Sequence, residues 1–236
     1  IYGKAVLAIL ELATGRFSRS EIFNLILNPC FTSRWKLEPD DVQSWADWAR
    51  ELNIFHTFDA ESKEIRGYAP SSNYTWKQGL ERLRLARIMT GSNINEPAEL
   101  THYQERVPFS NFKTGDVKLV EKFCVVIETL HRSVDRLNAK GLGIEQWKDR
   151  FLYICDQLID IPDASKGEEV VRQTLKKAFE NLELYDHLWR DDSSATLNIG
   201  LIREFINSNL ASISGGHGNY LTGGVTISAL QPMRPI

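Results

Sequence analysis

Apolar residues recur every three or four positions along most of this chain, and this helical spacing restricts its fold more than any other feature. The longest run covers residues 116–138, and Gly141 after it suits the end of a helix. The spacing predicts one long amphipathic helix here. Its apolar positions are Val117, Val120, Cys124, Ile127, Val134 and Leu137.

Signals for the start of a helix occur at several other places. Pro39 suits a first helical position, and Asn198 suits an N-cap. A capping box satisfies two exposed N–H groups reciprocally. Three pairs have its spacing: Ser18 with Glu21, Thr75 with Gln78, and Ser165 with Glu168. We therefore predict a mainly α, multi-helix fold, with an apolar helix before Gly15 and another over 144–159.

The chain divides into a long helical part and a short C-terminal part. We expect a helical domain over 1–215, in which 91–113 is a flexible loop because it contains Gly, Asn and Pro without a clear period. Residues 216–236 are predicted to be a glycine-rich connection and a short β-strand over 225–230. A strand without a partner, in a chain that begins with Ile1 rather than Met, suggests a segment cut from something larger.

Composition restricts the setting of the protein. A net charge of −3 and a pI near 6.0 exclude a generally basic nucleic-acid coat. Three widely spaced cysteines, Cys30, Cys124 and Cys155, favour a reducing compartment over a disulfide framework. The sequence contains no signal peptide and no apolar run long enough for a membrane span. We therefore expect a cytoplasmic protein without a membrane role.

No residue set suggests catalysis, a metal or a cofactor. The five histidines are isolated, and neither HExxH nor CxxC occurs. His131 lies on an apolar helix face, which favours a packing role. The glycines of 215–218 follow a helix and precede a strand, whereas a phosphate-binding Walker A loop has the opposite order.

One helix carries a cluster of basic residues. Residues 75–90 have a net charge of +3, and Lys77, Arg84 and Arg87 are spaced to share one side of the helix. Such a stripe could hold a phosphate backbone without reading sequence, and Trp76 beside it could stack on a base. The stripe could equally pair with acidic surfaces of this protein or of a partner.

Two regions of the chain resemble the bacterial RecC family. Residues 16–29, RFSRSEIFNLILNP, with Trp48 and Ile54 after them, are similar to a family pattern of RF, SEV, a leucine-rich run, W and GI. Residues 75–83, TWKQGLERL, resemble the family segment TW..GL.R. RecC is the gamma subunit of exodeoxyribonuclease V, a helicase–nuclease that processes double-strand breaks.

The C-terminal residues 220–236 resemble the RecC signature FL.G-V followed by LMPMRSIPF. In active helicase relatives this region reads roughly T.H.AKGLEF. Gln231 stands at the histidine position, Arg234 at the lysine and Pro235 at the first glycine. Proline removes an N–H and stiffens the backbone. The resemblance therefore implies a degenerate helicase motif that has lost its coupling to nucleotide.

The resemblance implies a superfamily 1 helicase fold in which 1–215 is the 2B-like insertion and 221–236 returns to a missing 2A-like domain. It further implies a non-catalytic scaffold that helps to form channels for single-stranded DNA beside RecB-like and RecD-like subunits. Two alternatives stay open. One is a fragment of an active helicase or nuclease of the UvrD or AddB type. The other is a protein-interaction bundle unrelated to DNA.

Overall fold

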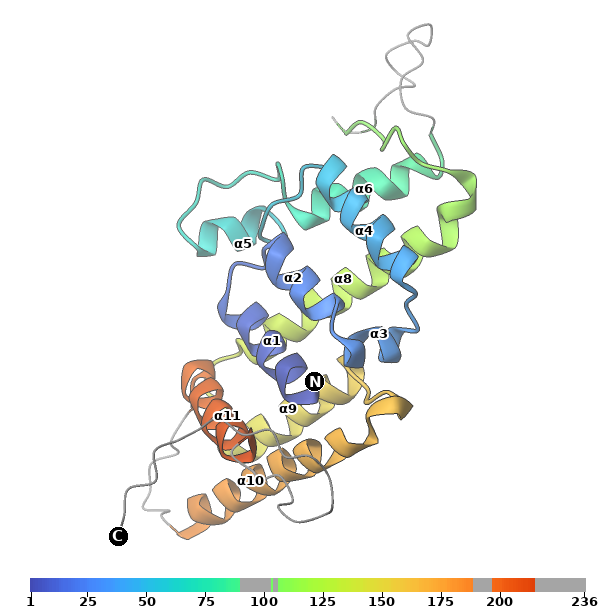
Figure 1. The fold of residues 1–236 in the computed structure, drawn as a ribbon. Coiled ribbons are helices and arrows are strands. Elements are labelled where there is room, and N and C mark those ends of the chain that lie inside the picture. The colour runs from blue at the N-terminus through green and yellow to red at the C-terminus, as the bar shows by residue number, and fades with distance from the viewer. Residues whose placement is uncertain (90–102, 104–105, 189–196, 215–236) are drawn as a thin grey trace, which may run out of the picture.

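The computed structural model describes residues 1–89, 103, 106–188 and 197–214, and these are mainly helical (Figure 1). The predicted fold class is confirmed over these ranges. The first half of the chain contributes α1 (Tyr2–Thr14), α2 (Arg19–Ile26), α3 (Pro29–Trp35), α4 (Pro39–Glu51), α5 (Ala60–Ile65) and α6 (Trp76–Ala86). The second half contributes the 3-10 turn η1 (Thr114–Asp116), α8 (Val117–Leu137), α9 (Ile144–Leu158), the 3-10 turn η2 (Asp163–Glu168), α10 (Glu169–Leu188) and α11 (Ile199–Ser214).

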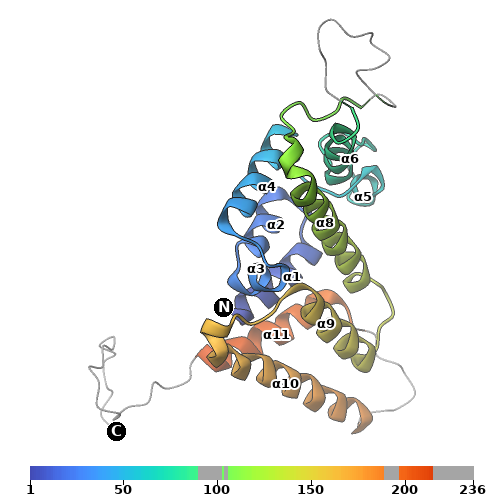
Figure 2. The same ribbon diagram turned by 90° about the vertical axis from the view of Figure 1, so that its right-hand side faces the viewer.

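Helix α8 connects the two ends of the molecule. It packs on α6 at one end and on α9 at the other, and it crosses α1 between them (Figures 1 and 2). Helices α9, α10 and α11 form a second group that closes against α1. The long helix predicted over 116–138 therefore serves as the common support of both groups.

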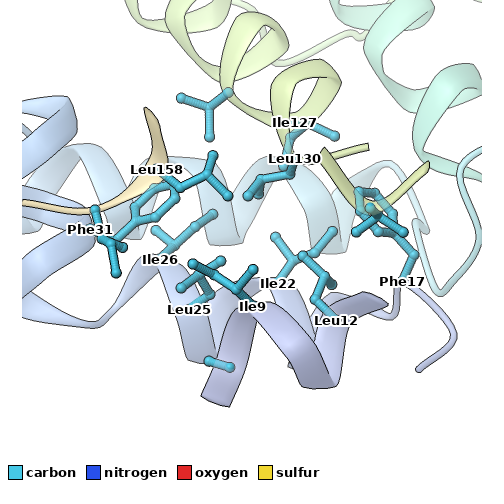
Figure 3. Packing of buried hydrophobic residues seen from close by; sticks show 14 of the residues in the cluster. Ile9, Leu12, Phe17, Ile22, Leu25, Ile26, Phe31, Ile127, Leu130 and Leu158 are labelled. Carbon is cyan, nitrogen blue, oxygen red and sulfur yellow. The ribbon is translucent and has the colours of Figure 1, made fainter. Parts of the chain in front are cut away.

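The core is continuous across these helices. Figure 3 shows side chains from α1, α2, α3, α8 and α9 meeting in one cluster. Most are excluded from solvent, so each contributes on the order of 2 kcal/mol of burial free energy. The labelled members are Ile9, Leu12, Phe17, Ile22, Leu25, Ile26, Phe31, Ile127, Leu130 and Leu158.

Two of the three predicted capping pairs act at helix starts. The Ser18 hydroxyl accepts from the Glu21 N–H, and the Glu21 carboxylate accepts from the Ser18 N–H at 2.8 Å. Thr75 caps α6 by accepting from the Gln78 N–H, whereas the Gln78 side chain accepts from the N–H of Tyr74. Only the first pair is thus a complete capping box.

The third predicted capping pair is wrong. Ser165 and Glu168 lie inside η2, and α10 begins only at Glu169. The Glu168 carboxylate instead accepts from the N–H of Tyr2 at 2.8 Å. That N–H lies in the first turn of α1 and lacks a partner within its own helix, so a long-range contact replaces the local one.

Helices α3 and α5 were not predicted. Pro29 is the first residue of α3, where Asn28 caps it. Asp59 caps α5. Both helices are shorter than two and a half turns, so their sequences show little periodicity.

A buried hydrogen bond joins the start of α6 to the start of α2. The indole N–H of Trp76 donates to the carbonyl of Phe17 at 2.9 Å. Between them, the Thr57 N–H donates to the carbonyl of Arg16 and the Trp76 N–H donates to the carbonyl of Thr57. Phe17 and Thr57 have φ of 55° and 59°, in the left-handed region that such side chains rarely adopt. The network holds both residues in this conformation.

His131 of α8 packs against the same network. Its ring stacks on Phe58 with centroids 3.7 Å apart, and its Nε2 lies 3.3 Å from Asp135 Oδ2. Burial lowers the pKa of His131 below 6.5, although the carboxylates of Asp135 and Asp59 oppose this effect. The predicted packing role for His131 is confirmed.

The lowered pKa of His131 makes the stability of the fold sensitive to acid. The unfolded chain binds a proton as pH falls through about 6.5, before the folded chain does, so the free energy of unfolding should fall below that pH. His131→Phe keeps the ring on Phe58 and removes the titration, so its stability should change less with pH. Urea unfolding of both proteins between about pH 7.5 and pH 5 measures this. Equal pH dependence would contradict the prediction, and His56 accounts for part of the remaining slope.

Gly79 of α6 allows a close approach between α6 and Ile54. A Cβ at this position would lie 2.3 Å from Ile54 Cδ1 and 2.7 Å from its Cγ1. Ile54 is fully buried, so it can move aside only by displacing its neighbours in the core. Overpacking of this kind costs about 1–3 kcal/mol, against a gain of at most about 1 kcal/mol from the better helix propensity of alanine.

Gly79→Ala should therefore destabilise the chain by about 1–2 kcal/mol in urea unfolding. Adding Ile54→Val removes Cδ1 and should restore part of the loss. Gly115→Ala is the matched control, because nothing lies within 4 Å of a Cβ there. A Gly79→Ala variant as stable as the original chain would contradict the close packing described here.

Candidate nucleic-acid interface

Helix α6 carries the basic residues that the sequence identifies as candidates for DNA contact. Its first turn is anchored, because the Lys77 N–H donates to the carbonyl of Phe58 at 2.8 Å. The apolar residues of α6 face the core, with Leu80 and Leu83 buried. This amphipathic arrangement leaves Lys77, Arg84 and Arg87 on the exposed part of the helix.

Trp76 belongs to the core and not to the surface. Its ring is fully buried, packs against Phe17 and Phe123 with centroids 6.3 and 6.2 Å away, and donates its N–H to Phe17. No face of the ring is open to a base. The stacking role suggested for Trp76 is therefore corrected: its position beside basic residues reflects the boundary between core and surface.

Arg84 is already paired within the protein. Its Nη2 lies 2.6 Å from Oε1 of Glu128 on α8, and both side chains are partly exposed. Burial lowers the pKa of Arg84, but the hydrogen bond to Glu128 and the charge of Glu128 outweigh this effect. The pKa of Arg84 is therefore raised above its usual value. An exposed pair of this kind contributes little to stability, but it neutralises one charge of the stripe. Arg84 thus follows the second alternative that the sequence leaves open for the basic residues, which is pairing with an acidic surface of this protein.

Arg82 is displaced from the stripe, as its spacing predicts, and has a structural role. Its Nε donates to the carbonyl of Val107 at 2.9 Å, and burial lowers its pKa. Arg106 in turn pairs with Glu81 at 2.5 Å. These contacts attach the segment 106–113, part of the loop expected over 91–113, to α6; the rest of that loop lies mostly outside the described residues.

Lys77 and Arg87 are the cations of α6 that stay available. Both side chains are exposed, and neither forms an ion pair with a described residue. Lys77 lines a shallow cavity with Asp59, Glu61 and Arg106. Asp59 and Glu61 reduce the positive field at this end of the helix.

The structure also exposes two aromatic residues that the sequence did not single out. Phe55 and Tyr74 lie in the loops before α5 and α6, and both rings are about half exposed. No helical or strand periodicity surrounds either residue in the sequence, so their exposure becomes evident only in the folded loops. Arg16 and Arg19, at the start of α2, lie in the same region, because the Arg19 N–H donates to the carbonyl of Phe55.

The cysteines are unsuited to nucleophilic chemistry. All three are buried free thiols. Burial raises the pKa of Cys30 and of Cys124 to about 11, and it raises that of Cys155 further. A thiol that stays protonated near neutral pH behaves as a small apolar side chain.

Within 1–89, 103, 106–188 and 197–214, no three His, Cys, Asp or Glu side chains are grouped so that they could hold a metal ion. In the same ranges, no helix combines the length and the apolar character needed to cross a bilayer.

The residues that carry the RecC resemblance gather at one place in the fold. Phe17 bonds to Trp76, Glu21 caps the turn that includes Arg16, and Ile54 packs on Gly79. The start of the 16–29 pattern thus meets the start of the 75–83 pattern. The helicase-like positions Gln231, Arg234 and Pro235, and the strand predicted before them, lie outside the described residues.

Comparison with known proteins agrees with this resemblance. Residues 2–214 match the family model described as the RecBCD enzyme subunit RecC fourth domain. The chain is 26% identical over 232 residues to the RecBCD enzyme subunit RecC of Mycolicibacterium smegmatis, which covers 97% of this chain and 19% of that protein. It is 25% identical over 230 residues to the protein of the same name from Mycobacterium tuberculosis, with the same two coverages.

The chain therefore spans about a fifth of the length of the curated relatives it matches. The family model covers nearly all of the chain, and a buried hydrogen bond joins residues from the two parts of the resemblance. On this basis the chain belongs to the RecC family, in the region of the RecC fourth domain.

Proposed function

We propose that this chain is a non-catalytic scaffold domain of a RecC-like subunit, within a cytoplasmic helicase–nuclease of the RecBCD type that acts in double-strand break repair and recombination. In this proposal the domain is the 2B-like insertion of a superfamily 1 helicase fold. It helps to line a channel for single-stranded DNA and contacts RecB-like and RecD-like subunits, which carry out catalysis.

The observation that carries the proposal is the use of the family residues for packing. Trp76, Phe17 and Gly79 all face inward, and their contacts are with one another or with neighbouring core residues. Residues retained for catalysis would instead converge on an open cavity. A pattern used to hold helices together supports an architectural role.

The degenerate motif supports the same proposal from the sequence. Gln231, Arg234 and Pro235 stand where active helicases of the resemblance have His, Lys and Gly. A proline in place of glycine restricts the backbone, so coupling between nucleotide and movement is not expected there.

The proposed DNA contact depends on charge. Lys77 and Arg87 are exposed without a paired carboxylate among the described residues, whereas Arg84 is held by Glu128. Two lysine or arginine contacts suffice for weak binding to a phosphate backbone, without reading of sequence. Such binding would guide a strand that other subunits move.

The purified chain should neither hydrolyse ATP nor cut DNA. Phosphate release with single-stranded DNA and magnesium, and degradation of a labelled linear duplex, should both stay at the level of a blank. Activity that copurifies with the chain, and that a substitution in the chain abolishes, would favour the alternative of an active helicase or nuclease.

Binding of the chain to single-stranded DNA should weaken with salt, and the slope should depend on Lys77 and Arg87. For Lys77→Ala with Arg87→Ala, the slope of log K against log salt should decrease by up to ~1.4, because each phosphate contact on a single strand contributes about 0.7. Fluorescence anisotropy over a range of salt concentrations measures this. Arg84→Ala should have less effect, since its charge is offset by Glu128.

The matched control is Lys176→Ala with Lys177→Ala, which removes the same charge from exposed positions on α10. An equal decrease in the control would show that binding follows net charge and not α6. Unchanged binding in both double variants would remove α6 from the proposal, whereas no detectable binding by the unaltered chain would favour an interaction bundle unrelated to DNA.

A further inference from the structure

Phe55 and Tyr74 form an exposed aromatic pair at the surface of the unit that joins α2 to α6. Their ring centroids are 5.6 Å apart with planes at 62°, and the residues are 50% and 55% exposed. Two large rings in contact with each other and open to water present a continuous apolar surface. Side chains of this size are normally placed where they lose more water.

The backbone holds this pair in place. The Phe55 N–H donates to the carbonyl of Tyr74 at 3.0 Å, and the Arg19 N–H donates to the carbonyl of Phe55 at 2.9 Å. The residue before Phe55, Ile54, and the residue after Tyr74, Thr75, are both fully buried. The two rings are therefore presented by rigid loops anchored on the core, which lowers the entropy lost on binding.

Neither burial nor backbone preference accounts for a tyrosine at position 74. Its φ is 64°, a conformation that glycine or asparagine adopts more readily than a bulky residue. The ring gains little from packing, since more than half of the residue is exposed. Strain of this kind, held by surrounding hydrogen bonds, is common at binding surfaces.

Several cations lie near the aromatic pair. The Arg19 guanidinium lies 5.9 Å from the centroid of the Phe55 ring. Beside Phe55, His56 has a pKa lowered first by burial and then by the positive charges of Lys63, Arg16 and Arg66, so these three cations lie near the same loop. Arg16, Arg19 and Arg66 form no ion pair with any residue that the structure describes.

We propose that Phe55 and Tyr74, with Arg16 and Arg19 beside them, bind single-stranded DNA by stacking on its bases and neutralising its phosphates. Exposed rings next to unpaired cations are the combination that holds single strands with little sequence preference. A duplex would not fit, because its base faces are already stacked. The inference rests on the proposed DNA contact and extends it to residues other than Lys77 and Arg87.

A protein surface is the competing occupant, because tyrosine, phenylalanine and arginine also form interaction hot spots. The charges favour DNA. Several cations face outward here without a paired carboxylate, and a polyanion neutralises all of them at once, whereas a protein would need a matching acidic cluster. The experiment below separates the two.

The test variant combines Phe55→Ala with Tyr74→Asn. Asparagine tolerates the positive φ at position 74, and both side chains are half exposed, so the fold should be kept. Affinity for a labelled oligothymidylate of about 16 nucleotides should fall at least about fivefold, because each stacked base contributes on the order of 1 kcal/mol or more. Circular dichroism and urea unfolding confirm that the variant is folded.

Tyr153→Ala is the matched control. Tyr153 on α9 is 53% exposed and also lies near an arginine, with the Arg136 guanidinium 5.8 Å from its ring centroid, but it belongs to the opposite end of the molecule. Its removal should change affinity less than about twofold, well below the effect of losing one stacked base. Arg16→Ala with Arg19→Ala should flatten the salt dependence, whereas the aromatic variant should weaken binding at every salt concentration.

Each result decides the inference. A weakened aromatic variant with an unaffected Tyr153→Ala supports it. Unchanged DNA binding in the aromatic variant, with weaker binding in Lys77→Ala plus Arg87→Ala, overturns the aromatic surface and leaves the proposed function intact. If the variant binds DNA normally but no longer assembles with the rest of the RecC-like subunit, the pair is a protein contact. No DNA binding by the unaltered chain overturns both the aromatic surface and the proposed DNA contact.

Discussion

The hydrogen bond from the Trp76 indole to the Phe17 carbonyl is the constraint on which the arrangement of α2, α6 and α8 depends. Both partners are buried, so losing either would leave a polar group without water, at a cost of about 1–3 kcal/mol. The bond also fixes Phe17 in its left-handed conformation, which turns the chain from α1 into α2. Trp76 then packs on Phe123 of α8. One donor therefore sets the relative position of three helices.

The helices could be predicted where the information is local. Ser18 and Glu21 lie three residues apart and satisfy each other, so their capping box follows from the sequence. The pair of Ser165 and Glu168 has the same spacing, but Glu168 bonds to Tyr2, 166 residues away along the chain. The spacing is the same in both pairs. What differs is the competing partner, which only the packed fold brings near.

The same limit applies to the candidate site. The spacing of Lys77, Arg84 and Arg87 on one side of a helix was predictable, but Glu128 reaches Arg84 from a helix more than forty residues later. Trp76 follows the N-cap of α6 and precedes a lysine, which is equally typical of an exposed ring; its burial depends on α8 covering it. Phe55 and Tyr74 give no periodic signal, because each lies in a loop whose course is set by distant contacts.

The loops that close the core also orient the surface, since in each of them an exposed aromatic residue adjoins a buried residue. Ile54 is buried and Phe55 is exposed; Tyr74 is exposed and Thr75 is buried. Each exposed ring is joined through the backbone to a residue that the core holds in place, so the buried neighbour restricts where the ring can lie. A family pattern preserved for packing would in this way also preserve a surface that the pattern does not contain. The scaffold and the proposed binding surface are therefore two sides of the same loops, and the buried side supplies the rigidity that the exposed side needs.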